Sequence, residues 1–296
     1  MAAKRFYRLA KKSVQAWLDD YASSIGAAIA FYTVFSLAPL MLIVIGVAGF
    51  FWGEEAVRGE LMRQVGGVVG DNGAAAIEGV VSSSAVETGQ GIFATIVSIV
   101  FLTIGATRVF AELQSALDRI WKAPAQEKTT GIWKLIRARL LSFGLVLSLA
   151  FLLLVSLVIS TMLAALGGWV GGMLPGWEAI LHVLNIVVSF GILTVLFAMI
   201  FKFMPQVDVA WKDVWTGAAV TALLFEIGKL LIGMYVGKSS VASAYAAAGS
   251  LVVVLLWVYY AAQVFLLGAE FTWVYANEHG SRAGRGDAPT EPAEKE

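Results

Sequence analysis

An apolar run from Val214 to Val236 is long enough to cross a bilayer, and it carries two opposite charges near its middle. Glu226 and Lys229 lie about one helical turn apart in this run. A charged side chain at bilayer depth costs roughly 2.5 to 3.5 kcal/mol on insertion scales. Such residues are therefore rare and usually face a packed or watery interior. A polar function of this chain is expected at this pair.

The composition of the whole chain is that of a membrane protein. Hydrophobic residues make up 59% of its 296 residues, charged residues 14%, and cysteine is absent. A soluble protein of this length could not bury so much apolar surface. We predict an all-α polytopic membrane protein in which residues 1–276 form one transmembrane domain and residues 277–296 a disordered cytoplasmic tail. The six predicted spans are residues 25–51, 91–107, 140–166, 179–201, 214–236 and 248–275.

The distribution of Lys and Arg predicts the orientation. These residues gather in the N-terminal segment, after the second span, after the fourth span and in the tail, whereas Arg58, Arg63 and Lys238 fall on the other side. The positive-inside rule places the basic side, and both termini, in the cytoplasm.

Three stretches outside the spans have helical periodicity. Residues 54–69 and 72–86 predict a periplasmic helical hairpin, and residues 108–121 a cytoplasmic continuation of the second span. The N-terminal segment has an apolar stripe with its cations on the other faces. Two interpretations stay open for it: a helix anchored to anionic lipid, or a helix packed on the bundle with its cations in water. The stripe consists of Phe6, Ala10, Val14, Trp17 and Tyr21.

Three segments carry a resemblance to a known family. They are AAIAFYTVFSLAPL (residues 27–40), GATRVFAELQSALDRIW (residues 105–121) and most of residues 214–276. They resemble the BrkB (YihY-like) family of bacterial inner-membrane proteins, formerly labelled ribonuclease BN. Asp118 and Ala246 depart from the family pattern, where Asn and Gly are usual. The resemblance implies an inner-membrane protein, with virulence-related labels and suspected transport of lipid or small solutes among its members.

The nuclease label can be tested on the residues. Hydrolysis of RNA by a metal needs a cluster of His, Asp or Glu ligands with an open position for water. The two histidines, His182 near the outer end of the fourth span and His279 in the tail, cannot share a site in this topology. We therefore expect no enzymatic activity, no metal, no cofactor and no nucleic-acid partner.

Other polar groups extend the expected site within the membrane. Gln263 lies as many residues from the inner end of the sixth span as Glu226 lies from that of the fifth, about 18 Å, so both should sit at one depth. Tyr260, Gln263 and Glu270 share one stripe of the sixth span. Glu270 is only about 7 to 8 Å deep, where water or Arg108 could meet it, so we expect a lower gate or an anchor there rather than part of the central site.

The first span adds a proline at mid-membrane. Pro39 has no N–H and therefore leaves a backbone carbonyl free near Ser36 and Tyr32. Transporters often bind substrate at broken or kinked helices near the midplane of the membrane. The simpler explanation is a kink that only shapes packing. Likewise, Glu226 and Lys229 could be an ion pair that only fixes helix register.

Two functions follow from these alternatives. The first is a transporter or translocator of lipid or another amphiphilic or small solute, with a polar cavity lined by the first, fifth and sixth helices. The second is a membrane scaffold whose outer hairpin and cytoplasmic helices bind envelope partners. Membrane lipids are the expected partners in either case, and the sequence leaves homo-oligomerisation open.

Overall fold

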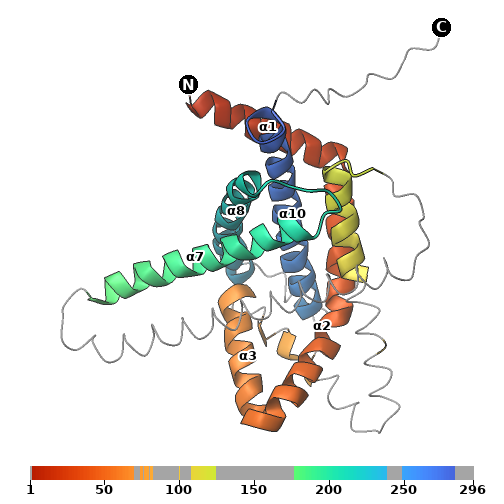
Figure 1. Cartoon of the computed structure of the whole chain (residues 1–296). Helices are drawn as coiled ribbons and strands as arrows, with labels where there is room; N and C mark the ends of the chain where they lie inside the picture. The colour runs from red at the N-terminus through yellow and green to blue at the C-terminus, as the bar shows by residue number, and fades with distance from the viewer. Residues whose placement is uncertain are drawn as a thin grey trace. The chain divides into compact units, whose positions relative to one another are not determined.

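The computed structural model describes residues 2–69, most of 74–82, residue 100, and residues 108–124, 177–238 and 249–283 (Figure 1). Every regular element in these ranges is a helix, which confirms the all-α class for the described part of the chain. The predicted spans 91–107 and 140–166 lie outside the described residues. So do residues 284–296 of the predicted tail.

Four of the predicted spans coincide with long helices. The helices begin and end within three residues of the predicted bounds, and two stretches, Ile186–Phe203 and Val252–Glu278, are long and apolar enough by themselves to cross a membrane. The N-terminal helix and the first helix of the outer hairpin are also present, and residues 108–120 are helical. The elements are α1 (Ala2–Asp19), α2 (Ala22–Trp52), α3 (Glu54–Val69), α7 (Trp177–Phe203), α8 (Trp211–Lys238) and α10 (Gly249–Glu278).

The chain groups into two compact units. The first contains Met1–Trp17, Leu117–Leu223 and Leu267–Glu296, and the second contains Leu18–Ala116 and Leu224–Leu266. Helices α8 and α10 contribute one half to each unit.

In the first unit, α8 and α10 approach each other through two glycine and threonine pairs. The Thr272 side chain lies against Gly217, and the Thr221 side chain lies against Gly268. Each threonine hydroxyl donates a 2.7 Å hydrogen bond to the glycine carbonyl one turn earlier in its own helix. The hydroxyls are thus satisfied within their helices, and the missing glycine side chains let the two backbones approach closely.

The second unit has its core between α2, α3, part of residues 74–82 and the first half of α10. Ile45, Ile77, Val81 and Val254 are buried there, and Val57, Leu61 and Val65 of α3 pack against them. Gly53 joins α2 to α3 with φ at 87°, a left-handed conformation that favours glycine, and its N–H donates to the Gly49 carbonyl at 2.8 Å. Figure 1 shows α3 folding back beside α2 after this turn.

The boundary predicted for the tail is wrong by several residues. Asn277 and Glu278 belong to α10, and residues 279–283 form a turn held by hydrogen bonds. Composition alone suggested disorder because this stretch is small and polar. It is ordered because the buried Asp213 carboxylate accepts hydrogen bonds from Ser281, a partner 68 residues away in the sequence.

Candidate functional site

The charged pair in α8 forms an ion pair within its own helix. Lys229 Nζ lies 2.8 Å from Glu226 Oε2, and the side chains are 30% and 33% exposed. Glu226 is 15 residues from Trp211, so it lies about 22 Å along a 28-residue helix. The pair therefore lies near the middle of the helix, and both of its side chains are partly exposed.

The geometry of this pair limits its structural value. Because the two residues are three positions apart in one helix, the pair does not join α8 to another helix and cannot by itself set helix register. Pairs of this kind contribute roughly 0.3 to 0.5 kcal/mol, far less than the roughly 2.5 to 3.5 kcal/mol for placing one charge at bilayer depth. The described residues add no further polar partner to it. A polar group from elsewhere would have to meet the pair.

Two polar side chains of α10 lie against glycines of neighbouring helices in the second unit. Tyr260 lies against Gly228 of α8 and donates its hydroxyl to the Leu224 carbonyl at 3.2 Å. Gln263 lies against Gly26 of α2. The contacts join α10 to α8 and to α2. These three helices correspond to the first, fifth and sixth predicted spans, which were expected to line the site.

Gln263 keeps one buried acceptor. Its Nε2 donates to the Ala22 carbonyl at 3.3 Å, whereas its Oε1 is buried and has no hydrogen-bond partner in the described part of the chain. An unpaired buried amide oxygen typically costs about 1 to 3 kcal/mol. A hydrogen-bond donor, such as water or the ammonium or hydroxyl group of a ligand, would remove that cost.

The predicted site residues of α2 make contacts within their own helix. Ser36 is buried and donates to the Thr33 carbonyl at 3.0 Å within its own helix. Tyr32 is partly buried beside Phe31, with ring centroids 5.7 Å apart. Helix α2 is continuous through Pro39, whose side chain lies outside the description.

Glu270 differs from its predicted environment. It lies in the first unit and is 1% exposed, so its carboxyl group is enclosed by protein rather than open to water. The expectation of an accessible gate at Glu270 rested on its shallow depth. It ignored the side chains that cover this end of α10.

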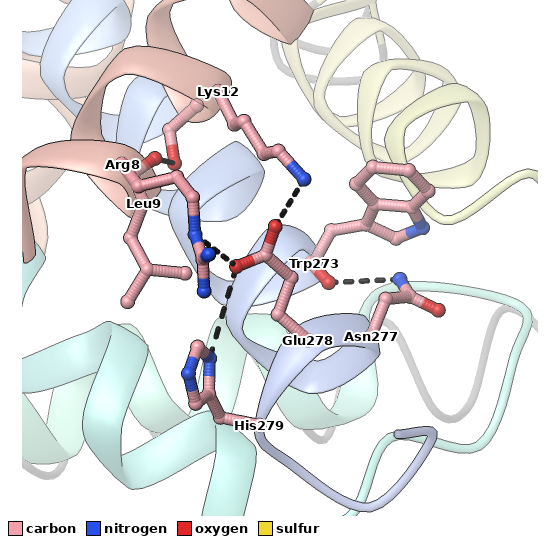
Figure 2. Close-up of polar contacts among 8 residues, drawn as sticks. Arg8, Leu9, Lys12, Trp273, Asn277, Glu278 and His279 are labelled. Atoms are coloured by element: carbon pink, nitrogen blue, oxygen red, sulfur yellow. Dashed lines mark hydrogen bonds and ion pairs between the residues drawn. The ribbon is translucent and has the colours of Figure 1, made fainter. Parts of the chain in front are cut away.

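A polar cluster that was not predicted from the sequence lies at the end of α10 (Figure 2). We call it the helix-end junction. The Glu278 carboxylate pairs with the Lys12 ammonium, and its Oε2 lies 3.6 Å from Arg8 Nε. His279 Nδ1 lies 3.9 Å from the same oxygen. Leu9, between the two cations in sequence, packs on Phe271 and Val274. The junction therefore ties α1 to the end of α10.

The turn after α10 extends the helix-end junction to α8. Asp213 Oδ2 accepts hydrogen bonds from the Ser281 hydroxyl at 2.6 Å and from the Ser281 N–H at 3.2 Å. Arg282 donates to the Asp208 carbonyl at 3.4 Å, and its guanidinium lies 5.1 Å from the centre of the Trp121 ring. These contacts hold the turn on the first residues of α8.

The segment between α7 and α8 is also fixed by charged side chains. Lys202 pairs with Asp208 and donates to the Val209 carbonyl at 2.7 Å, and the Asp118 carboxylate accepts from the Gln206 N–H at 2.7 Å. The Lys202 ammonium lowers the pKa of Asp208, whereas burial raises the pKa of Asp118 despite its hydrogen bond. These contacts fix the segment that leads from α7 into α8.

The helix-end junction joins α1, α8 and the end of α10 through ion pairs and hydrogen bonds. Among the described residues, no group of three or more His, Asp or Glu could hold a metal ion. The only local signal for the junction is the pair of cations one turn apart at Arg8 and Lys12. Their common partner, Glu278, is 266 residues from Lys12 and could not be found from helical periodicity.

Comparisons with known proteins place the chain among bacterial membrane proteins. The family model described as Virulence factor BrkB matches residues 13–294. A UPF0761 membrane protein of Stenotrophomonas maltophilia is 27% identical over 266 residues, covering 86% of this chain and 58% of that protein. One from Pseudomonas aeruginosa is 26% identical over 260 residues, covering 86% and 59%. One from Pseudoalteromonas translucida is 27% identical over 260 residues, covering 86% and 81%.

The chain thus spans less than two thirds of the length of the first two of these relatives. No solved structure matches it.

Proposed function

Because the chain belongs to the BrkB virulence factor family, whose relatives are named membrane proteins, we propose that it is a transporter of lipid or another amphiphilic solute. We place it in the bacterial inner membrane with six spans and both termini in the cytoplasm. Four described helices of 27 to 31 residues support this topology, since about 20 residues suffice to cross the hydrocarbon core. The Lys and Arg distribution supports the orientation.

The observation that carries the proposal is the ion pair of Glu226 and Lys229. It joins no helices, its side chains are about one third exposed, and it lies near the middle of α8. An arrangement that costs more than it stabilises is expected where polar solutes pass. The pair offers a cation to a phosphate and an anion to an ammonium group, so a phospholipid headgroup suits it chemically. Gln263 offers a further acceptor on α10.

The test is transbilayer movement of headgroup-labelled phospholipid in proteoliposomes. The double variant Glu226→Gln with Lys229→Met removes both charges and leaves neither one unpaired. We expect movement with the unaltered protein and a rate equal to that of protein-free vesicles with the double variant. Movement at the unaltered rate would overturn the proposal. Helix content and a monodisperse elution profile establish that the variant is folded.

The chain provides a matched control for this experiment. Glu60 and Arg63 of α3 form an ion pair with the same three-residue spacing, at 2.9 Å from Arg63 Nε to Glu60 Oε2, outside the predicted spans. Glu60→Gln with Arg63→Met removes the same charges from an exposed surface. This control variant should transport at the unaltered rate.

A scaffold is the second candidate, and one observation favours it. Phe50, Phe51 and Trp52 are 71% to 85% exposed at the turn between α2 and α3, where an envelope partner could bind. A scaffold should keep its cellular function with Glu226→Gln and Lys229→Met, and lose it when α3 is replaced by an unrelated helix. A transporter should show the reverse for the double variant.

A further inference from the structure

Helix α1 has one docked face. Leu9 and Ser13 are buried, and Leu9 contacts Phe271 and Val274 of α10. The Ser13 hydroxyl donates to the Leu9 carbonyl at 2.9 Å, so its burial leaves no donor unsatisfied. Figure 2 shows the Arg8 and Lys12 side chains of this helix pointing toward Glu278. The remaining faces of α1 are not used by this contact.

Part of the apolar stripe predicted for α1 packs on the bundle, and part of it does not. The Phe6 ring lies 6.4 Å from the Phe271 ring of α10, whereas Val14 is 46% exposed. Tyr7, outside the predicted stripe, is 71% exposed. At 100° per residue, Tyr7 and Val14 lie roughly 140° to 160° around the helix from Leu9. The interpretation that the stripe packs on the bundle therefore holds at Phe6 but not at Val14, and Tyr7 and Val14 form an exposed apolar ridge on α1.

Cations border this ridge. Arg8 and Lys12 are engaged by Glu278, whereas Lys4, Arg5 and Lys11 are exposed and have no partner among the described residues. Lys4 and Lys11 are seven residues apart and lie beside Tyr7 on the helical wheel. The exposed surface of α1 thus combines apolar side chains with uncompensated positive charge.

We propose that α1 binds the surface of an anionic bilayer with this ridge while Leu9 keeps it docked on α10. The Tyr7 and Val14 side chains would enter the boundary between headgroups and acyl chains, and Lys4 and Lys11 would contact lipid phosphates. Charge favours lipid over an apolar protein partner, since an anionic bilayer offers phosphates along the whole helix. The docked face holds α1 at the membrane and raises its effective concentration there.

The test uses the full chain, which contains no native cysteine. Single cysteines at Tyr7, Val14 and Gln15 carry nitroxide labels, Gln15 being an exposed position on the cationic side. The protein is reconstituted in vesicles of phosphatidylcholine alone or mixed with phosphatidylglycerol. Collisions with oxygen, which concentrates in acyl chains, are compared with collisions with an aqueous nickel complex.

In the mixed vesicles we expect oxygen access and nickel shielding for labels at positions 7 and 14, and nickel access at position 15. Each cation at an anionic surface adds roughly a fivefold factor to binding. Lys4→Gln with Lys11→Gln should therefore lower the ratio of bound to unbound label roughly 25-fold.

Three results would overturn the proposal. Nickel access at positions 7 and 14 in both vesicle types would mean that the ridge faces water. Shielding of the labels from nickel that changes neither with phosphatidylglycerol nor with the lysine substitutions would exclude recognition of anionic lipid. Spin–spin broadening that grows with the protein-to-lipid ratio would assign the ridge to a second copy of the chain.

Discussion

The Asp213 carboxylate, at the start of α8, accepts hydrogen bonds from both the hydroxyl and the N–H of Ser281, just beyond the end of α10. Asp213 is 1% exposed, so these bonds form away from water. Gly280 lies against the same carboxylate, where a side chain would collide with Asp213 Oδ1. The last described turn of the chain is thereby fixed to a residue of α8 that lies 68 positions earlier in the sequence.

Removing this carboxylate should release the turn. Asp213→Ala should cost about 1.5 to 3 kcal/mol, the range for hydrogen bonds to charged groups. Ser281→Ala should cost about 1 kcal/mol, because the N–H donor remains. Limited trypsin digestion measures the release, since cleavage after Arg282 requires the turn to open. Equal cleavage rates in Asp213→Ala and the unaltered protein would contradict this role.

Because α8 and α10 approach closely in the first unit, adding a single methyl group at Gly217 should lower the stability of the protein. Gly217→Ala would place a Cβ within the Thr272 side chain, and overpacking of this kind costs roughly 1 to 3 kcal/mol. Adding Thr272→Ala should recover only part of that loss, because it removes Oγ1 and Cγ2 but leaves the Cβ of residue 272 at 2.6 Å from the new methyl group. Gly59→Ala in α3 is the control, because its Cβ meets no atom within 4 Å and the change should stabilise the helix by about 0.5 to 1 kcal/mol. Thermal unfolding in detergent compares the four proteins.

The docking of α1 should depend more on Leu9 than on Glu278. Truncating a buried leucine costs roughly 2 to 5 kcal/mol, whereas ion pairs with exposed partners contribute about 0 to 1 kcal/mol. Arg8 and Lys12 are more than half exposed. Hydrogen exchange of α1 amides should therefore rise strongly in Leu9→Ala and little in Glu278→Gln. The opposite order would show that charge holds the helix.

The pKa values of Asp118 and Asp208 should lie on opposite sides of the usual value of 3.8. Burial raises the pKa of Asp118, and the hydrogen bond and charge of Lys202 lower the pKa of Asp208. The contribution of the Asp208 pair to stability is thus present above pH 3.8 and lost as the pH falls through its lowered pKa. Stability linked to Asp118 has the other sign and decreases as the pH rises through its raised pKa.

Carbon-13 NMR of labelled Asp carboxyl groups in micelles measures both transitions. At pH 3.8 Asp118 should be mostly protonated and Asp208 mostly ionised. Lys202→Met should return the pKa of Asp208 toward its ordinary value and leave Asp118 unchanged. A common pKa for both groups would contradict the ion pair.

Removing one charge of the α8 pair should be worse than removing both. Glu226→Gln leaves Lys229 unpaired in an apolar helix, at a cost of roughly 2.5 to 3.5 kcal/mol. Adding Lys229→Met removes the unpaired charge and its cost. Compared with the unaltered protein, the double variant lacks only an ion pair that contributes under about 0.5 kcal/mol. The double variant should therefore unfold at a temperature near that of the unaltered protein, and well above Glu226→Gln. Equal losses in both variants would show that the pair has a larger structural role.

Local patterns were sufficient to predict the helices. The apolar runs and the amphipathic pattern of residues 54–69 gave bounds close to those of α2, α3, α7, α8 and α10, because helix formation reflects periodicity over neighbouring residues. The same patterns identified Glu226 and Lys229 as charges out of place. They could not predict the exposure of the pair or the burial of Glu270, which depend on which helices meet.

The helix-end junction shows the limit of sequence reasoning. Glu278 is a single acid in a polar stretch, and nothing near it in the sequence indicates Arg8 or Lys12 as its partners. Asp213 likewise looks like a residue in the first turn of a helix, although it binds Ser281. Such pairings arise only when distant segments are brought together, so composition suggested disorder where the chain is fixed.

A transporter of this kind requires that a polar molecule reach the ion pair of α8 within the bilayer. The most direct measurement is the reaction of a membrane-impermeant methanethiosulfonate with a single cysteine at Lys229, in protein that also carries Glu226→Gln, reconstituted in vesicles. Ile227, an exposed apolar residue of the same helix, supplies the control cysteine. We expect the cysteine at position 229 to react and the cysteine at position 227 to remain unmodified. Protection of both positions would contradict a polar pathway at this site.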